Sequence, residues 1–174
     1  MAKHPLHEKV GDFLKKFAKK NDFEIRLDPA CDPKGGQHIP LFCGPKALTT
    51  RLCCVDAMLL KDGKVAVVIE IEESNIKPTQ ICGKYLTTAL SSIYNHENDG
   101  EIFLKPKSVN FIQILDTSSP HKKLQFENIK DMIESNLGSR GSIKKYDIIG
   151  IDWEKEKNNS KLENDLYNIL NGVL

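Results

Sequence analysis

The stretch from Val67 to Ser74 reads VVIEIEES, an apolar run that ends in three carboxylates. Because side chains alternate along a β-strand, Glu70 and Glu72 point to one face and the neighbouring isoleucines to the other. The isoleucines can pack into a core, whereas Glu73 is expected to mark where the strand leaves that core. A carboxylate in an otherwise apolar strand needs a compensating partner, and this segment gives no such partner by itself.

The segment before it supplies a third carboxylate. RLCCVDAMLL at 51–60 predicts a long strand, and KDGK at 61–64 predicts a tight turn that folds it back onto the acidic strand. This hairpin should bring Asp56 close to Glu70 and Glu72. Carboxylates at close range repel one another unless something positive lies between them, and oxygen-only ligands suit Mg²⁺ or Mn²⁺. We therefore expect a metal site here. The alternative is that the charges simply mark a solvated strand end. That explanation suits Asp56 least, because Asp56 is expected in the middle of its strand.

The rest of the chain alternates between helical and strand patterns. The expected elements are a helix around 10–17, a strand at 23–27, a loop at 28–50, the hairpin, a helix at 78–94, a strand at 108–115, a helix at 121–137, a strand at 146–153 and a helix at 160–174. A hairpin followed by helix–strand crossovers predicts an α/β fold, a mixed β-sheet flanked by helices on both faces.

Composition limits the classes of protein that the chain can belong to. Its 174 residues suit a single domain spanning 1–174, and 40% hydrophobic residues allow a packed core. A net charge of +1 gives no strong electrostatic sign of a nucleic-acid partner.

The chain has no apolar run long enough to cross a bilayer and no signal-peptide pattern at its start, so we expect no membrane partner and a cytoplasmic location. The five cysteines include no CxxC pair, and in a cytoplasmic protein we expect them to be reduced thiols.

An Asp in one strand, a hairpin, and an acidic pair that ends the next strand before a helix together resemble the PD-(D/E)xK nuclease superfamily. The resemblance implies a restriction-endonuclease-like fold, with an αβββαβ core from the first helix to the strand near Phe111 and additional C-terminal α, β and α elements. Asp56 matches the first acidic position of the motif and Glu70 the second. Glu72 stands where most members carry lysine, as in the variants with an ExE motif.

What the resemblance implies is Mg²⁺- or Mn²⁺-dependent hydrolysis of DNA phosphodiester bonds, of the restriction or the repair and resolvase type. Asp56 and Glu70 would be metal ligands and Glu72 a ligand or base. In other branches of the family the lysine comes from a neighbouring element. Lys77 and Lys84 are the candidates for this lysine here. Helical spacing places Gln80 on the same face as Lys84, in a supporting role. Glu8 resembles an additional metal ligand of the family, although an acidic residue also simply favours a helix N-terminus.

Basic residues around this motif could contact a phosphate backbone. The candidates are Lys34, His38, Lys46, Arg51 and Lys77. The alternative for those in the loop is a solvated segment that packs through its apolar residues. As in many superfamily members, the implied assembly is a homodimer that cuts two strands. Two other functions stay open. One is a catalytically silent member of the fold that binds nucleic acid or protein. The other is a nucleotide-binding or small-molecule-binding α/β protein, which the absence of a glycine-rich phosphate loop disfavours.

Overall fold

The structure is a computed structural model that describes residues 4–73, 77–119, 121, 123–124, 126, 139–158 and 160–173. Its elements are α1 (Pro5–Asn21), β1 (Glu24–Leu27), β2 (Ile39–Phe42), β3 (Arg51–Val55), β4 (Ala57–Lys61), β5 (Lys64–Glu72), α2 (Pro78–Leu90), β6 (Ile93–His96), β7 (Gly100–Phe103), β8 (Val109–Asp116), β9 (Ile143–Ile151), α4 (Trp153–Glu156) and α5 (Lys161–Asn171). Most of the helix expected at 121–137 lies outside the described residues. No described helix has the length and apolar character that a membrane span requires.

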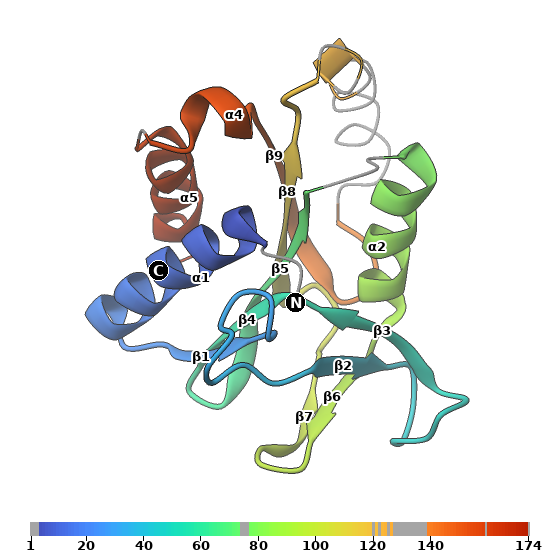
Figure 1. Cartoon of the computed structure of the whole chain (residues 1–174). Helices are drawn as coiled ribbons and strands as arrows, with labels where there is room; N and C mark the ends of the chain where they lie inside the picture. The colour runs from blue at the N-terminus through green and yellow to red at the C-terminus, as the bar shows by residue number, and fades with distance from the viewer. Residues whose placement is uncertain are drawn as a thin grey trace.

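A five-stranded mixed sheet forms the centre of the molecule, with strand order β1-β4-β5-β8-β9 (Figure 1). β4 runs antiparallel to β1 and β5, while β5, β8 and β9 are parallel. β5 is rich in β-branched residues that suit a covered strand, and β8 is buried over its whole length. The predicted α/β class and mixed sheet are confirmed.

The turn between β4 and β5 fixes the register of the two acidic strands. Asp62 and Gly63 both have positive φ, 50° and 67°, as the mirror-image turns of two-residue hairpins require. This turn pairs Ala57 with Ile69 and leaves Asp56 one residue beyond the paired segment, beside the acidic end of β5. The predicted hairpin is therefore present.

Two separate cores cover the two faces of this sheet. α1 and α5 pack on one face through Leu14 and Leu166, against residues that include Ile69 and Ile71 of β5. α2 packs on the opposite face, where Tyr85 and its neighbours meet a second sheet. Figure 1 shows α1 and α5 on one side of the central strands and α2 on the other. Because strand side chains alternate, Glu70 points away from Ile69 and toward the α2 side.

The prediction of one strand over 51–60 was wrong. The chain bends at Asp56, so that β3 joins a second, four-stranded antiparallel sheet with order β3-β2-β6-β7, while β4 stays in the main sheet. Val55 packs in one core and Ala57 in the other. The segment expected to be a loop at 28–50 contains β2, which pairs with both β3 and β6.

The expected helix at 78–94 was too long. α2 ends at Leu90, and Ile93 to His96 form β6 instead, because their pairing with β2 and β7 satisfies the backbone there. The helix expected at 160–174 is α5, which spans Lys161–Asn171; Ser160 stands at its N-cap position without a side-chain cap hydrogen bond. β9 begins at Ile143, three residues earlier than predicted, since its pairing with β8 begins there.

Candidate active site and metal centre

The bend at Asp56 directs this carboxylate toward the end of β5. Its backbone NH donates to the Ile69 carbonyl at 3.2 Å, and its own carbonyl accepts from Asp28 N at 2.8 Å. Its side-chain Oδ2 accepts from Ile71 N at 2.7 Å. Burial raises the pKa of Asp56, while nearby His7 and the Ile71 hydrogen bond oppose the rise. The backbone thus holds Asp56 between the end of β3 and the start of β4, with one carboxylate oxygen fixed against β5.

Glu70 is the most buried charge of the site. Its side chain has an exposed fraction of 0%, and its Oε2 lies 2.9 Å from Lys84 Nζ. Its Oε1 is buried and has no hydrogen-bond partner among the described residues. Burial raises the pKa of Glu70 well above its usual range; the charge of Asp56 adds to this rise and Lys84 opposes it. A buried carboxylate oxygen without a partner is unusual in a folded protein.

Glu72 and Lys84 complete the charged cluster. Burial raises the pKa of half-buried Glu72, against the opposing effect of Lys84. Burial lowers the pKa of Lys84, but attraction to Glu70 outweighs it, so the pKa of Lys84 is raised and its amine stays protonated. Three carboxylates therefore act on one ammonium group. Among the described residues, the ligand atoms of His4, His7 and Glu73 lie within 4.8 Å of one another, whereas Asp56, Glu70 and Glu72 form no such group.

The α1 residue at this site is His7 rather than Glu8. Glu8 is exposed on the outer side of the helix, because it lies one position beyond the buried face that His7 and Leu6 share. His7 Nε2 lies 3.8 Å from Asp56 Oδ2, and His7 Nδ1 lies 2.9 Å from Glu73 Oε1. Glu73, expected only to mark the end of the strand, also accepts from the backbone NH of His7 at 2.9 Å. Two histidines spaced three apart at the start of α1 are the signal that could have identified this contact.

Of the three residues predicted on or just before α2, one lies at the carboxylates. Lys84 contacts Glu70, whereas Gln80 is exposed and Lys77 is the exposed residue before the helix begins. The glutamine beside Glu70 is Gln113, which pairs with it in the β5–β8 register. Its amide donates to the Ile81 carbonyl at 3.3 Å, and its carbonyl accepts from Tyr146 at 2.5 Å.

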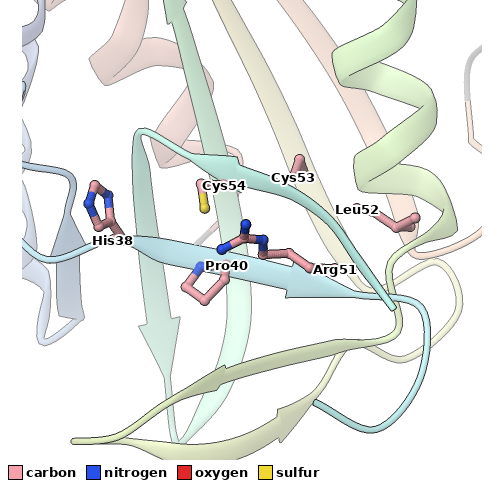
Figure 2. Close-up of a pocket in the computed structure, with 6 residues that line it drawn as sticks. All are labelled: His38, Pro40, Arg51, Leu52, Cys53 and Cys54. Atoms are coloured by element: carbon pink, nitrogen blue, oxygen red, sulfur yellow. The ribbon is translucent and has the colours of Figure 1, made fainter. Parts of the chain in front are cut away.

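The residues predicted to contact nucleic acid are on the surface. Lys34, His38, Lys46, Arg51 and Lys77 are all exposed. His38 and Arg51 line an open groove of about 540 Å³ over β2 and β3, together with Pro40, Leu52, Cys53 and Cys54 (Figure 2).

This groove lies within electrostatic reach of the carboxylates. Burial raises the pKa of the Cys54 thiol, and the charges of Arg51, Glu70 and Lys84 also act on it. Burial likewise raises the pKa of Cys53 to about 11, and Glu70 acts on this thiol too. Two residues of the groove, Cys53 and Cys54, thus lie within electrostatic range of Glu70.

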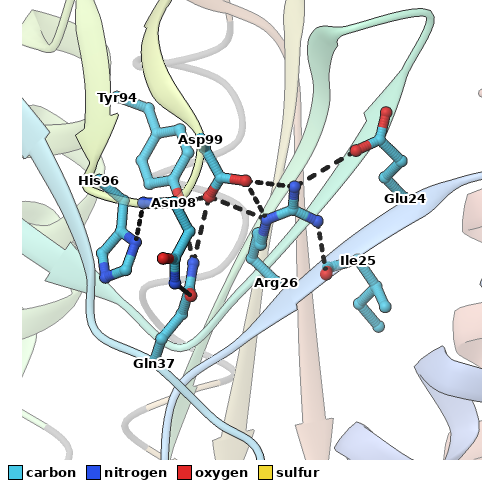
Figure 3. Close-up of polar contacts among 8 residues, drawn as sticks. All are labelled: Glu24, Ile25, Arg26, Gln37, Tyr94, His96, Asn98 and Asp99. Carbon is cyan, nitrogen blue, oxygen red and sulfur yellow. Dashed lines mark hydrogen bonds and ion pairs between the residues drawn. The ribbon is translucent and has the colours of Figure 1, made fainter.

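A second buried carboxylate, Asp99, lies away from this site and is fully paired (Figure 3). Arg26 of β1 donates to both of its oxygens, Tyr94 of β6 donates its hydroxyl, and Gln37 Nε2 lies at 3.2 Å. These hydrogen bonds, above all those from Arg26, lower the pKa of Asp99 to about 2. Because Arg26 belongs to the main sheet and Tyr94 to the second sheet, the cluster joins the two sheets.

Comparison of the chain with protein-family models, with curated proteins and with solved structures gives no match.

Proposed function

We propose that the protein is a divalent-metal-dependent nuclease that hydrolyses phosphodiester bonds of DNA. One observation carries the proposal: Glu70 is fully buried, has one oxygen without a partner among the described residues, and lies beside Asp56, Glu72 and Lys84. An unpartnered buried carboxylate oxygen is costly to stability, which suggests that the arrangement is maintained for ligand binding.

In this proposal Asp56 and Glu70 hold the cation, which polarises the scissile phosphate and lowers the pKa of the attacking water. Glu72 lies on the same strand face at the more exposed end of β5, where it can accept a proton from water. The Lys84 ammonium, 2.9 Å from Glu70, can stabilise negative charge that develops on the phosphate. The lysine that the motif lacks at position 72 is thus supplied from α2.

The groove over β2 and β3 offers a path for the phosphate backbone toward these residues. Arg51 and His38 line it, and Arg51 can donate two hydrogen bonds to one phosphate. Lys46 lies in the connection between β2 and β3, beyond the groove. Such contacts are independent of base sequence, so they would position DNA without selecting a recognition site.

The topology also supports a restriction-endonuclease-like assignment. The order helix, three strands, helix, strand that the resemblance implies has counterparts in α1, β1, β4, β5, α2 and β8. The second sheet is then an addition inserted after β1 and after α2. Cutting both strands of a duplex would require two such sites, which a homodimer supplies.

A catalytically silent DNA-binding fold is the second candidate. The observation that favours it is the Lys84–Glu70 ion pair, which already occupies one of the oxygens that a metal would use. In that case the cluster would stabilise the end of β5, and the groove alone would be functional.

Cleavage assays with supercoiled plasmid, linear duplex and single-stranded DNA separate the two candidates. Wild type should cut with Mg²⁺ or Mn²⁺ and not with EDTA. Asp56→Asn should lower the rate at least about 100-fold, whereas Asp12→Asn, a change of an exposed carboxylate on α1, should not. Cutting that persists in EDTA or in Asp56→Asn would refute the proposal. DNA binding without cutting under any condition would favour the silent fold.

A further inference from the structure

Two histidines at the start of α1 lie beside a glutamate at the end of β5. His4 is the residue before the helix begins and His7 lies in its first turn, three positions later. Their rings meet edge to face, with centroids 5.3 Å apart. Glu73 directly follows the last residue of β5 and meets His7 across 66 positions of sequence. The fold thus brings two imidazoles and one carboxylate together.

The ligand atoms of these three residues are close enough to approach one ion. They lie within 4.8 Å of one another. His7 Nδ1 is 2.9 Å from Glu73 Oε1, and His4 Nδ1 is 3.9 Å from Glu73 Oε2. Atoms that bind one Zn²⁺ at about 2.1 Å lie about 3 to 4 Å apart, and both distances are close to that range. The side chain of His4 is 46% exposed, so its ring can turn toward the same point.

The carboxylate of Glu73 is held in place independently of the His7 ring. Its Oε1 accepts a hydrogen bond from the backbone NH of His7 at 2.9 Å and also lies beside Nδ1 of the same residue. The backbone hydrogen bond is unaffected when Nδ1 gives up a proton to bind a metal ion. The oxygen and the nitrogen therefore stay close together around an ion.

A second carboxylate, that of Asp56, lies on the other side of the His7 ring. Its Oδ2 is 3.8 Å from His7 Nε2, which is too long for a hydrogen bond but short enough for charge attraction. A neutral imidazole carries its proton on one nitrogen and a lone pair on the other. With an ion at Nδ1, the negative charge of Asp56 favours the proton on Nε2. A carboxylate behind a metal-binding histidine is the usual arrangement at protein metal sites.

A simple hydrogen bond between His7 and Glu73 explains the position of only one ring. His4 Nδ1 lies beyond hydrogen-bond length from the second oxygen of the same carboxylate. Its backbone is restricted because the next residue is Pro5, the first residue of α1. Two rings beside the two oxygens of one carboxylate are the arrangement that a shared ion would use.

We propose that His4, His7 and Glu73 form a binding site for a divalent transition-metal ion such as Zn²⁺, separate from the carboxylates Asp56 and Glu70. Imidazole nitrogens suit Zn²⁺, whereas Mg²⁺ prefers oxygen ligands. Three protein ligands leave a position on the ion for water. The ion would join the start of α1 to the end of β5. This inference goes beyond the proposed function and does not depend on nuclease activity.

Titration of the metal-free protein with Zn²⁺ tests the inference, with ¹⁵N NMR of the histidine rings and calorimetry as readouts. The chain has five histidines. The ring signals of His4 and His7 should shift when Zn²⁺ is added, and those of the other three should not. His4→Gln should weaken Zn²⁺ binding at least about tenfold, since even the loss of a residue behind a metal ligand costs that much. His121→Gln, a change of another exposed histidine, is the matched control.

Thermal unfolding gives a second readout. Zn²⁺ should raise the unfolding temperature of wild type, because it binds the folded state, and should raise that of His4→Gln much less. Glu70→Gln should keep both the histidine shifts and the stabilisation by Zn²⁺, since Glu70 is not part of this site. The exposed position of His4 makes its substitution compatible with folding.

The outcomes separate this inference from the proposed function. No binding of Zn²⁺ by wild type, shifts confined to the other histidines, or an affinity that His4→Gln leaves unchanged would overturn the inference, while the nuclease proposal would stand. Zn²⁺ binding that is lost in Glu70→Gln and kept in His4→Gln would place the ion at the nuclease carboxylates and would also overturn it. Failure of the nuclease proposal appears instead in the cleavage assays, which leave the histidine shifts untouched.

Discussion

Asp99 and Glu70 are both buried carboxylates paired with a basic residue, yet their surroundings push their pKa values in opposite directions. Arg26, Tyr94 and Gln37 satisfy both oxygens of Asp99, and its pKa falls to about 2. Lys84 binds one carboxylate oxygen of Glu70, and the other oxygen has no partner among the described residues. Burial raises the pKa of Glu70. The two carboxylates thus differ in both respects: burial is the main cause of the raised pKa of Glu70, whereas hydrogen bonds are the main cause of the lowered pKa of Asp99.

Removing the charge of Asp99 should give the largest loss of stability. Asp99→Asn leaves the Arg26 guanidinium, 21% exposed, without its bidentate partner and loosens the junction between the sheets. We expect the free energy of unfolding to fall by about 3 kcal/mol in chemical denaturation. Asp12→Asn should change it by less than about 0.5 kcal/mol, because that side chain is 71% exposed. A loss no larger than that of the control would show that the Asp99 cluster does not hold the sheets together.

Acid should weaken the same cluster. Because folding lowers the pKa of Asp99 from 3.8 to about 2, the carboxylate stabilises the fold above pH 4, and this contribution is lost as pH falls from 4 to 2. The shift corresponds to about 2 kcal/mol. Unfolding free energies measured across this interval should decline less steeply in Asp99→Asn than in wild type. Equally steep declines in the two proteins would contradict the stabilising role of the Asp99 carboxylate.

In the metal-free protein, Glu70→Gln should have the opposite effect on stability to Asp99→Asn. The raised pKa of Glu70 means that its ionised form opposes folding, so an uncharged amide of equal size removes that cost. Lys84, which is 33% exposed, can turn its ammonium group to water. We expect unchanged stability or a gain of about 1 kcal/mol at neutral pH.

The exposed Glu101→Gln on β7 is the matched control for this substitution. Thermal shifts with and without Mn²⁺ add a second readout, since the wild type should be stabilised by the metal and Glu70→Gln should not. A loss above about 2 kcal/mol in the metal-free variant would mean that the Glu70–Lys84 pair is structural, like Asp99.

Local patterns predicted the parts of the fold that depend on neighbouring residues. The β-branched run of β5 and the Asp62–Gly63 turn predicted the hairpin that brings Asp56 beside β5, and Lys84, one of the two lysines named as candidates, contacts Glu70. The second sheet could not be predicted in this way. β2 is four residues long and contains Pro40, and its partner β6 lies some fifty residues further along the chain, so neither strand has a strong local signal.

The contacts that the sequence did not predict have the same cause. His7 meets Glu73 across 66 positions, and Arg26 meets Asp99 across 73. Helical periodicity marks Glu8 and His7 as neighbours, but only the packing of α1 against the sheet determines that His7 points inward. The bend at Asp56 is equally non-local, because two different cores receive the residues on either side of it.

Crystals soaked with Mn²⁺ and measured near the manganese absorption edge would test the metal site most directly. We predict an anomalous peak between the carboxylates of Asp56 and Glu70, absent from crystals of Asp56→Asn. The unpartnered Oε1 of Glu70 should be one of the atoms that face the ion. Saturating Mn²⁺ that leaves no peak at this position, with both Glu70 oxygens bound by protein groups instead, would contradict a cation site at the end of β5.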